Sequence, residues 1–231
     1  RIDASTGIPT QFIQLPSSVD IGDFNNDGGP PEALASELNT GIGNIAWDCI
    51  RGVLWASNFD DGRIYGIDAS GQVFATYDHA TGAIGTDGSL DQSDVAGFAP
   101  YGELVWAVCP TEDRMYYSVW VEDMDHPNPT RSNEIWSVGI DPAGMFIPGT
   151  AVKEIDMPDI VLSGGPEDWS SPVSDIATNE EGCCLFIAER SMRNPTTSAA
   201  HRSRLFKYCH DGSAWTPASE QFGIPYLPGG N

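Results

Sequence analysis

The chain has 231 residues, of which 40% are hydrophobic, enough to bury one sizeable core or two small ones. Its 33 acidic residues against 11 Lys and Arg give a formal net charge of −22, which disfavours nucleic acid and anionic membranes as partners. An acidic surface suits divalent cations, a high-salt environment or simple solubility. No stretch of 18 apolar residues occurs, so the sequence predicts no membrane insertion.

Residues 1–16 resemble the second half of a unit that recurs later in the chain. The run IDASTG at 2–7 matches IDASG at 67–71, and Phe12 then falls where Phe74 would. We therefore expect a half unit here, whose inner strands must come from elsewhere.

Residues 17–44 form a long connection rich in Gly and Pro, and it contains the start of a calcium-loop pattern. The candidate metal ligands are Asp23, Asn25 and Asp27. Gly28 then permits a sharp turn, but Leu34 and Pro31 stand where EF-hand and integrin-like loops need an acid. The alternative is a surface turn, which Asn and Asp favour without a metal.

Three complete units follow, predicted at 45–79, 98–159 and 172–224. Each consists of short runs rich in β-branched and aromatic residues, separated by turns such as Asp-Gly and Ser-Gly. Such runs predict an antiparallel meander of four strands. Within the second unit, the run 102–108 parallels 51–57 of the first.

The repetition predicts an all-β fold. The glycines of equivalent turns are Gly7, Gly71, Gly144 and Gly212. Their spacing exceeds the about 40–45 residues of a compact propeller blade by one long loop per unit. Four-stranded antiparallel meanders without helices indicate a β-propeller of about three and a half blades, with a β-sandwich as the alternative. Small closed propellers need at least four blades, so we expect a larger propeller, closed by further sequence or by a partner chain.

The five cysteines have no metal-ligand spacing, and their odd number forbids complete internal pairing. In an oxidising compartment the best disulfide joins Cys209 to Cys184 or Cys183, because their strands belong to one unit. The alternative is that all five are small buried side chains.

Six segments together carry a resemblance to a known class of proteins. They are 43–48, 91–100, 131–138, 170–176, 188–190 and 200–204. As a set they resemble the β-propeller of secreted bacterial surface and adhesin-like proteins, which also carry Ig-like repeat modules. The resemblance covers most of residues 40–210. It implies a propeller that is secreted or at the cell surface, and it brings no catalytic residues.

No signature of a serine hydrolase, a zinc protease or a phosphate-binding loop occurs in the sequence. The candidates for lining a central channel are the polar residues Asn58, Asp94, Asp175, Glu189 and Arg190. A lactonase-like propeller would use such a ring to hold a metal that acts as a Lewis acid. Alternatively, Glu189 and Arg190 pair with each other or with neighbours at a partly buried strand end.

These observations predict a non-enzymatic extracellular propeller that acts as a scaffold, adhesion or assembly module. Its long loops would bind other protein chains, further domains of the same protein, or glycan. The alternative is a calcium-dependent, lactonase-like hydrolase with its metal at the propeller axis.

Overall fold

The computed structural model describes residues 42–58, 61–86, 99–121, 132–158, 170–194, 197–198, 203–218 and 222–223, together with Thr6, Phe12, Ile13 and Leu15. All regular secondary structure in these residues is β-strand, which confirms the predicted all-β class. In the same residues no helix reaches the length and apolarity needed to cross a membrane.

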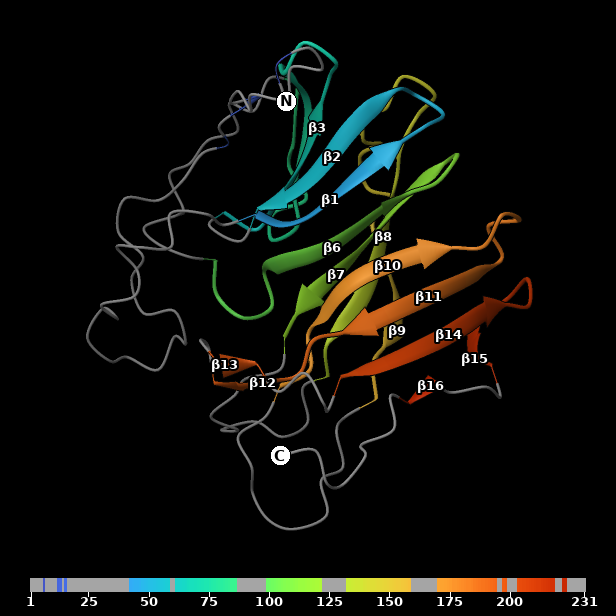
Figure 1. Cartoon of the computed structure of the whole chain (residues 1–231). Coiled ribbons are helices and arrows are strands. Elements are labelled where there is room, and N and C mark those ends of the chain that lie inside the picture. The colour runs from blue at the N-terminus through green and yellow to red at the C-terminus, as the bar shows by residue number, and fades with distance from the viewer. Residues whose placement is uncertain are drawn as a thin grey trace.

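The strands form three antiparallel sheets, which we call sheets 1, 2 and 3 (Figure 1). Sheet 1 contains β1 (Ile42–Asp48), β2 (Val53–Asn58), β3 (Arg63–Ile67), β4 (Val73–Asp78) and β5 (Ile84–Gly85). Sheet 2 contains β6 (Leu104–Pro110), β7 (Arg114–Trp120), β8 (Glu134–Gly139) and β9 (Val152–Asp156). Sheet 3 contains β10 (Val173–Thr178), β11 (Cys184–Glu189), β14 (Arg204–His210), β15 (Trp215–Pro217) and β16 (Phe222–Gly223). A separate ribbon pairs β12 (Met192–Asn194) with β13 (Thr197–Ser198).

Each sheet is largely a meander, because strands that follow one another in the chain pair side by side. The turn after β3 shows the local chemistry: the Asp68 carboxylate accepts hydrogen bonds from the N–H groups of Ser70 and Gln72. Gly71 closes this turn at φ 86°, a left-handed conformation that glycine adopts without a steric penalty. The turn after β8 is built in the same way, with Gly144 at φ 88°.

The three sheets stack face to face, and two separate hydrophobic cores fill the spaces between them. Between sheets 1 and 2 lie, among others, Trp55, Ile64, Tyr77, Val108 and Tyr117. Between sheets 2 and 3 lie, among others, Tyr116, Ile135, Ile176, Leu185 and Phe206. Sheet 2 is therefore buried on both faces, and the described strands form a stack that does not close into a ring.

One strand assignment from the sequence is wrong. The run 102–108 was matched to 51–57, which would make it a second strand, but β6 is the first strand of sheet 2 and the counterpart of β1. The counterpart of β2 is β7. Neighbouring strands of a meander share the same apolar and aromatic composition, so a similarity of composition identifies a strand without giving its place in the sheet.

Candidate functional site

The first strands of the three sheets, β1, β6 and β10, lie side by side along one edge of the stack (Figure 1). Each contains a β-bulge. In sheet 1, Ile42 lies opposite Asn58 and Ile45 opposite Ala56, so three steps along β1 match two along β2. The corresponding pairs are Val105–Val119 and Val108–Tyr117 in sheet 2, and Val173–Glu189 and Ile176–Ile187 in sheet 3. Bulges re-aim side chains and are frequent beside functional sites, so we call this edge the candidate site.

A buried serine ties the bulge of sheet 1 to sheet 2. The Ser57 hydroxyl accepts a hydrogen bond from the N–H of Asn44 at 2.9 Å and donates one to the carbonyl of Trp106. The bulge frees the backbone N–H of Asn44 from the regular strand ladder, and the serine satisfies it. The Ser57 side chain thus hydrogen-bonds the bulge of its own sheet and the first strand of the next sheet.

The same arrangement recurs between sheets 2 and 3. The Ser118 hydroxyl accepts from the N–H of Ala107 and donates to the carbonyl of Val173, both at 2.8 Å. In sheet 3 the equivalent position holds Ala188, which has no hydroxyl group. The first strands are therefore held in order by two equivalent serine bridges, and this contact does not continue beyond sheet 3.

Asp175 and Arg190, two of the predicted channel residues, lie at the candidate site. Asn44 Nδ2 donates to Asp175 Oδ1 at 3.0 Å and to the carbonyl of Ser174 at 2.9 Å, which links β1 directly to β10. The Arg190 guanidinium lies 5.9 Å from the centre of the Trp106 ring, within the range of a cation–π contact. Asn44 could not be identified from the sequence, because its equivalence to Asp175 depends on the two bulges.

Glu189 lies at the end of β11 and forms an ion pair within sheet 3. Its carboxylate is buried and accepts two hydrogen bonds from Arg204, at 2.6 Å from Nε and 2.8 Å from Nη2. Arg204 also donates to the carbonyl of Pro158 at 2.6 Å. The partner of Glu189 is thus Arg204, from the neighbouring strand, as expected for a charge that must be paired at a buried strand end.

Asn58 belongs to a different polar cluster, at the turn between β2 and β3. It hydrogen-bonds Asp61, whose carboxylate also accepts from the Tyr65 hydroxyl and from the N–H of Arg63. Burial raises the pKa of Asp61 to about 6, although these hydrogen bonds and the Arg63 charge oppose the shift. Asn58 therefore has a structural role, as a hydrogen-bond partner of the buried Asp61 carboxyl group.

Asp94 and the predicted calcium ligands Asp23, Asn25 and Asp27 lie outside the described residues. Within the part of the chain that the structure describes, no three His, Cys, Asp or Glu side chains gather as a metal-binding group.

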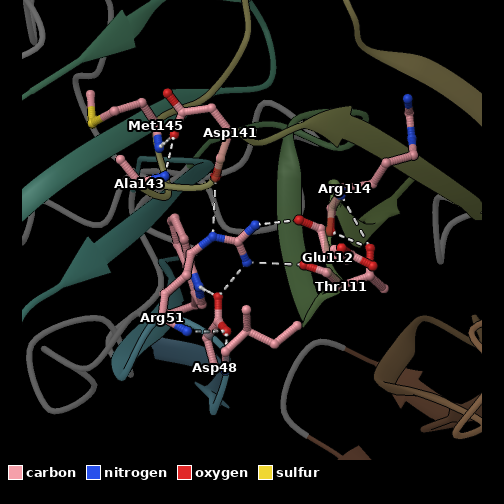
Figure 2. A network of polar contacts seen from close by, with 10 residues as sticks. Asp48, Arg51, Thr111, Glu112, Arg114, Asp141, Ala143 and Met145 are labelled. Atoms are coloured by element: carbon pink, nitrogen blue, oxygen red, sulfur yellow. Dashed lines mark hydrogen bonds and ion pairs between the residues drawn. The ribbon is translucent and has the colours of Figure 1, made fainter.

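A second inter-sheet contact lies at the opposite end of β1 and centres on Arg51 (Figure 2). Its guanidinium donates to Asp48 Oδ2 at 2.8 Å. It also donates to three carbonyl groups of sheet 2, those of Thr111 at 3.0 Å, Glu112 at 2.5 Å and Asp141 at 3.1 Å. The three carbonyl groups belong to turns, so Arg51 fixes the β6–β7 and β8–β9 turns relative to sheet 1.

Asp48 holds Arg51 in place, and its carboxylate accepts hydrogen bonds from several donors. Burial alone raises the pKa of this carboxyl group, but side-chain and backbone hydrogen bonds from Arg51, a bond from Trp55 Nε1 and the arginine charge lower it below its ordinary value. The side chains of Arg51 and Asp48 are only 4% and 2% exposed. The pair is therefore a buried, charged bracket between two sheets.

A disulfide joins Cys184 to Cys209, one of the two pairs proposed from the sequence. The two residues lie opposite each other on β11 and β14, with Cα atoms 4.1 Å apart. Cys183 and Cys49 are exposed, and Cys109 is buried between sheets 2 and 3. Burial raises the pKa of the Cys109 thiol to about 11.

Comparison with known proteins assigns no function: no protein-family model matches the chain, and neither does any curated protein sequence. Function is therefore inferred from the chain's own geometry.

Proposed function

We propose that this chain is part of an extracellular β-propeller that serves as a non-enzymatic scaffold, adhesion or assembly module. The observation that carries the proposal is the repeated relation between successive sheets: the bulges of β1, β6 and β10 are equivalent, and Ser57 and Ser118 make equivalent bridges. Radial repetition of four-stranded antiparallel sheets around first strands is the organisation of a propeller.

The polar groups at the candidate site support a mechanical role. Asn44 and Asp175 bind each other across the edge, and Glu189 is paired with Arg204. These contacts hold strands together and make the edge rigid. Binding surfaces are commonly carried on loops that such a rigid framework positions, so the long segments between the strands are the part that we expect to meet protein or glycan.

The proposed extracellular location is supported by the bond between Cys184 and Cys209. Disulfides persist in oxidising compartments and are rare in the reducing cytosol. The net charge of −22 further favours solubility outside the cell, where calcium and other cations are available as counter-ions.

The decisive experiment compares this proposal with a calcium-dependent hydrolase. Purified chain is incubated with a panel of lactones and aryl esters, with calcium or with a chelator, beside the variant Asp175→Ala. The matched control is Asp156→Ala, which removes an exposed acid that pairs only with Lys153 at 2.7 Å among the described residues. We expect no calcium-dependent turnover in any sample. Turnover that needs calcium and is lost only in Asp175→Ala would overturn the proposal.

A further inference from the structure

Sheet 1 leaves part of one face open at its first strand. Ile42, Ile45 and Trp47 are 53%, 58% and 62% exposed, which is unusual for large apolar side chains in a regular strand. Ala46, between Ile45 and Trp47, packs into the core toward sheet 2. Because side chains alternate along a strand, Ile45 and Trp47 point to the other side of the sheet. We call this surface the open face.

The residues equivalent to Ile42 and Ile45 are buried in both other sheets. Their counterparts, related by the matching bulges, are Val105 and Val108 in sheet 2 and Val173 and Ile176 in sheet 3. These four side chains are at most 4% exposed, because the preceding sheet of the stack covers each pair. The open face thus has the position and chemistry of a sheet–sheet interface.

The outer part of the same side of sheet 1 is already covered by a segment from early in the chain. Phe12, Ile13 and Leu15 pack against a core that includes Tyr65 and Ile67. The segment therefore covers the outer strands of sheet 1 and leaves β1 uncovered.

The position of this segment repeats a contact between sheets 1 and 2. A Cβ atom added to Gly71 would lie 3.5 Å from the Phe12 ring, and one added to Gly144 would lie 3.1 Å from the Phe74 ring. The Phe12 carbonyl oxygen comes closer still to Gly71, at 2.5 Å from such a Cβ atom. Phe12 thus meets the turn after β3 as Phe74 meets the turn after β8. Phe74 belongs to the fourth strand of its sheet, so Phe12, Ile13 and Leu15 lie against sheet 1 in the place that a fourth strand takes against sheet 2.

We propose that the open face binds a further antiparallel β-sheet of the same repeat, whose outer strand would include Phe12, Ile13 and Leu15. This inference rests on the propeller organisation proposed above. The side chains that the partner would place on sheet 1 can be described, because sheets 1 and 2 place equivalent side chains on the sheets that follow them.

The expected partner carries an aromatic-x-Ser pattern on its second strand and an isoleucine on its third. Sheet 1 presents Trp55, Ser57 and Ile64 to its neighbour, and sheet 2 presents Tyr116, Ser118 and Ile135 from the same register positions. The first strand contributes a small side chain, Ala46 or Cys109. The partner's serine would face the bulge of β1 at Gly43, the counterpart of Trp106.

A second copy of this chain is a poorer occupant. The remaining face of sheet 3 presents Phe186 and Ala188, but Ala188 lacks the bridging hydroxyl. Lys207 lies over the Phe186 ring at 5.8 Å, where sheets 1 and 2 have the small residues Gly66 and Ser137. A charged side chain at that position would have to be moved or desolvated before another sheet could pack there.

The test supplies the proposed partner strands within one chain. A copy of residues 104–139, which carries β6, β7 and β8, is fused directly before Ile2 of the full chain. In the fusion Gly139 of the added copy is followed by Ile2, just as Gly139 is followed by Ile140 in the chain itself. Hydrogen exchange of the peptide 42–48 is measured by mass spectrometry, since this peptide occurs only once in the fusion.

We expect exchange in 42–48 to slow at least tenfold in the fusion. A control fusion carries Tyr116→Asp and Ile135→Asp in the added copy alone, and its 42–48 peptide should exchange as in the unmodified chain. Unchanged exchange in the first fusion would overturn the inference. Protection of 42–48 in the unmodified chain that rises with protein concentration would also overturn it, in favour of a second copy.

A second measurement does not depend on the fusion folding. Trp47→Glu in the unmodified chain should reduce the binding of a hydrophobic dye while leaving the unfolding midpoint within about 2 °C, because the Trp47 side chain is 62% exposed. Val152→Glu, at an exposed site on β9, is the matched control and should leave dye binding unchanged. A large fall in the midpoint of Trp47→Glu would overturn the inference. Calcium-dependent hydrolysis, in contrast, would overturn the proposed function without affecting any of these readings.

Discussion

Replacement of Arg51 by methionine should be among the most destabilising single changes in the described part of the chain. Methionine keeps most of the apolar stem but removes the guanidinium, which donates to Asp48 Oδ2 and to the carbonyl groups of Thr111, Glu112 and Asp141. Asp48 keeps its hydrogen bonds from two backbone N–H groups and from Trp55 Nε1, but it loses its counter-charge. The turn carbonyls can recover hydrogen bonds from water. Asp48 cannot, because its side chain is 2% exposed.

The magnitude follows from the charge that is left behind. Removing one partner of a buried ion pair costs about 3–5 kcal/mol, since the remaining charge has lost its counter-charge. That is a large fraction of the roughly 5–15 kcal/mol by which a domain is usually stable. Asp48→Asn in the Arg51→Met background removes the orphaned charge, so the double variant should be more stable than Arg51→Met alone.

Urea denaturation at pH 7, followed by tryptophan fluorescence, measures these differences. Lys153→Met is the control, because it removes a cation that is 40% exposed and should cost less than about 1 kcal/mol. The low pKa of Asp48 adds a pH signature: its stabilising contribution is present above pH 3.8 and is lost as the pH falls through the lowered value. A loss below about 1 kcal/mol for Arg51→Met at pH 7 would refute the reasoning.

Three further changes test other parts of the structure. Asp61 has a pKa of about 6 against an ordinary 3.8, so its contribution to stability is present at low pH and is lost as the pH rises through 6; Asp61→Asn should gain up to about 3 kcal/mol on wild type between pH 4 and pH 7.5, and parallel pH profiles would contradict this. Removal of the Cys184–Cys209 disulfide, which spans 25 residues, should cost about 3.5 kcal/mol by loop entropy, measured with Cys184→Ser/Cys209→Ser; an unchanged urea midpoint would show that the bond does not constrain the unfolded chain. Ser118→Ala removes two buried hydrogen bonds, from the N–H of Ala107 and to the carbonyl of Val173, and should cost about 1–3 kcal/mol, whereas the exposed Ser213→Ala should cost less; equal effects would count against the serine bridge.

Local chemistry made much of each sheet predictable. The turns after β3 and β8 follow from an Asp whose carboxylate accepts backbone N–H groups and a Gly that adopts positive φ. The short apolar runs on either side are long enough for strands and too short for helices. The pairing of Cys184 with Cys209 was among the possibilities because strands of one meander are neighbours.

The candidate site was harder to predict, because its geometry depends on the bulges. The place of Asp175 and Arg190 at strand ends predicts that they line a channel, but it points neither to Asn44 nor to the pairing of Glu189 with Arg204. A bulge adds one residue to one strand and shifts which side chain faces which neighbour. Nothing in the composition of β1, β6 or β10 marks the point at which the extra residue falls.

The sequence by itself determined the all-β class, the turn positions and the repetition of similar units, since each depends on residues close together in the chain. The tertiary structure decided which strand comes first in each sheet and which residues cross from one sheet to the next. It also decided that Val108 and Ile176 are covered while Ile45 is exposed, although all three are β-branched residues at equivalent positions. The physical reason is that burial depends on what packs against a face, and the strands that cover it are distant in sequence from the face itself.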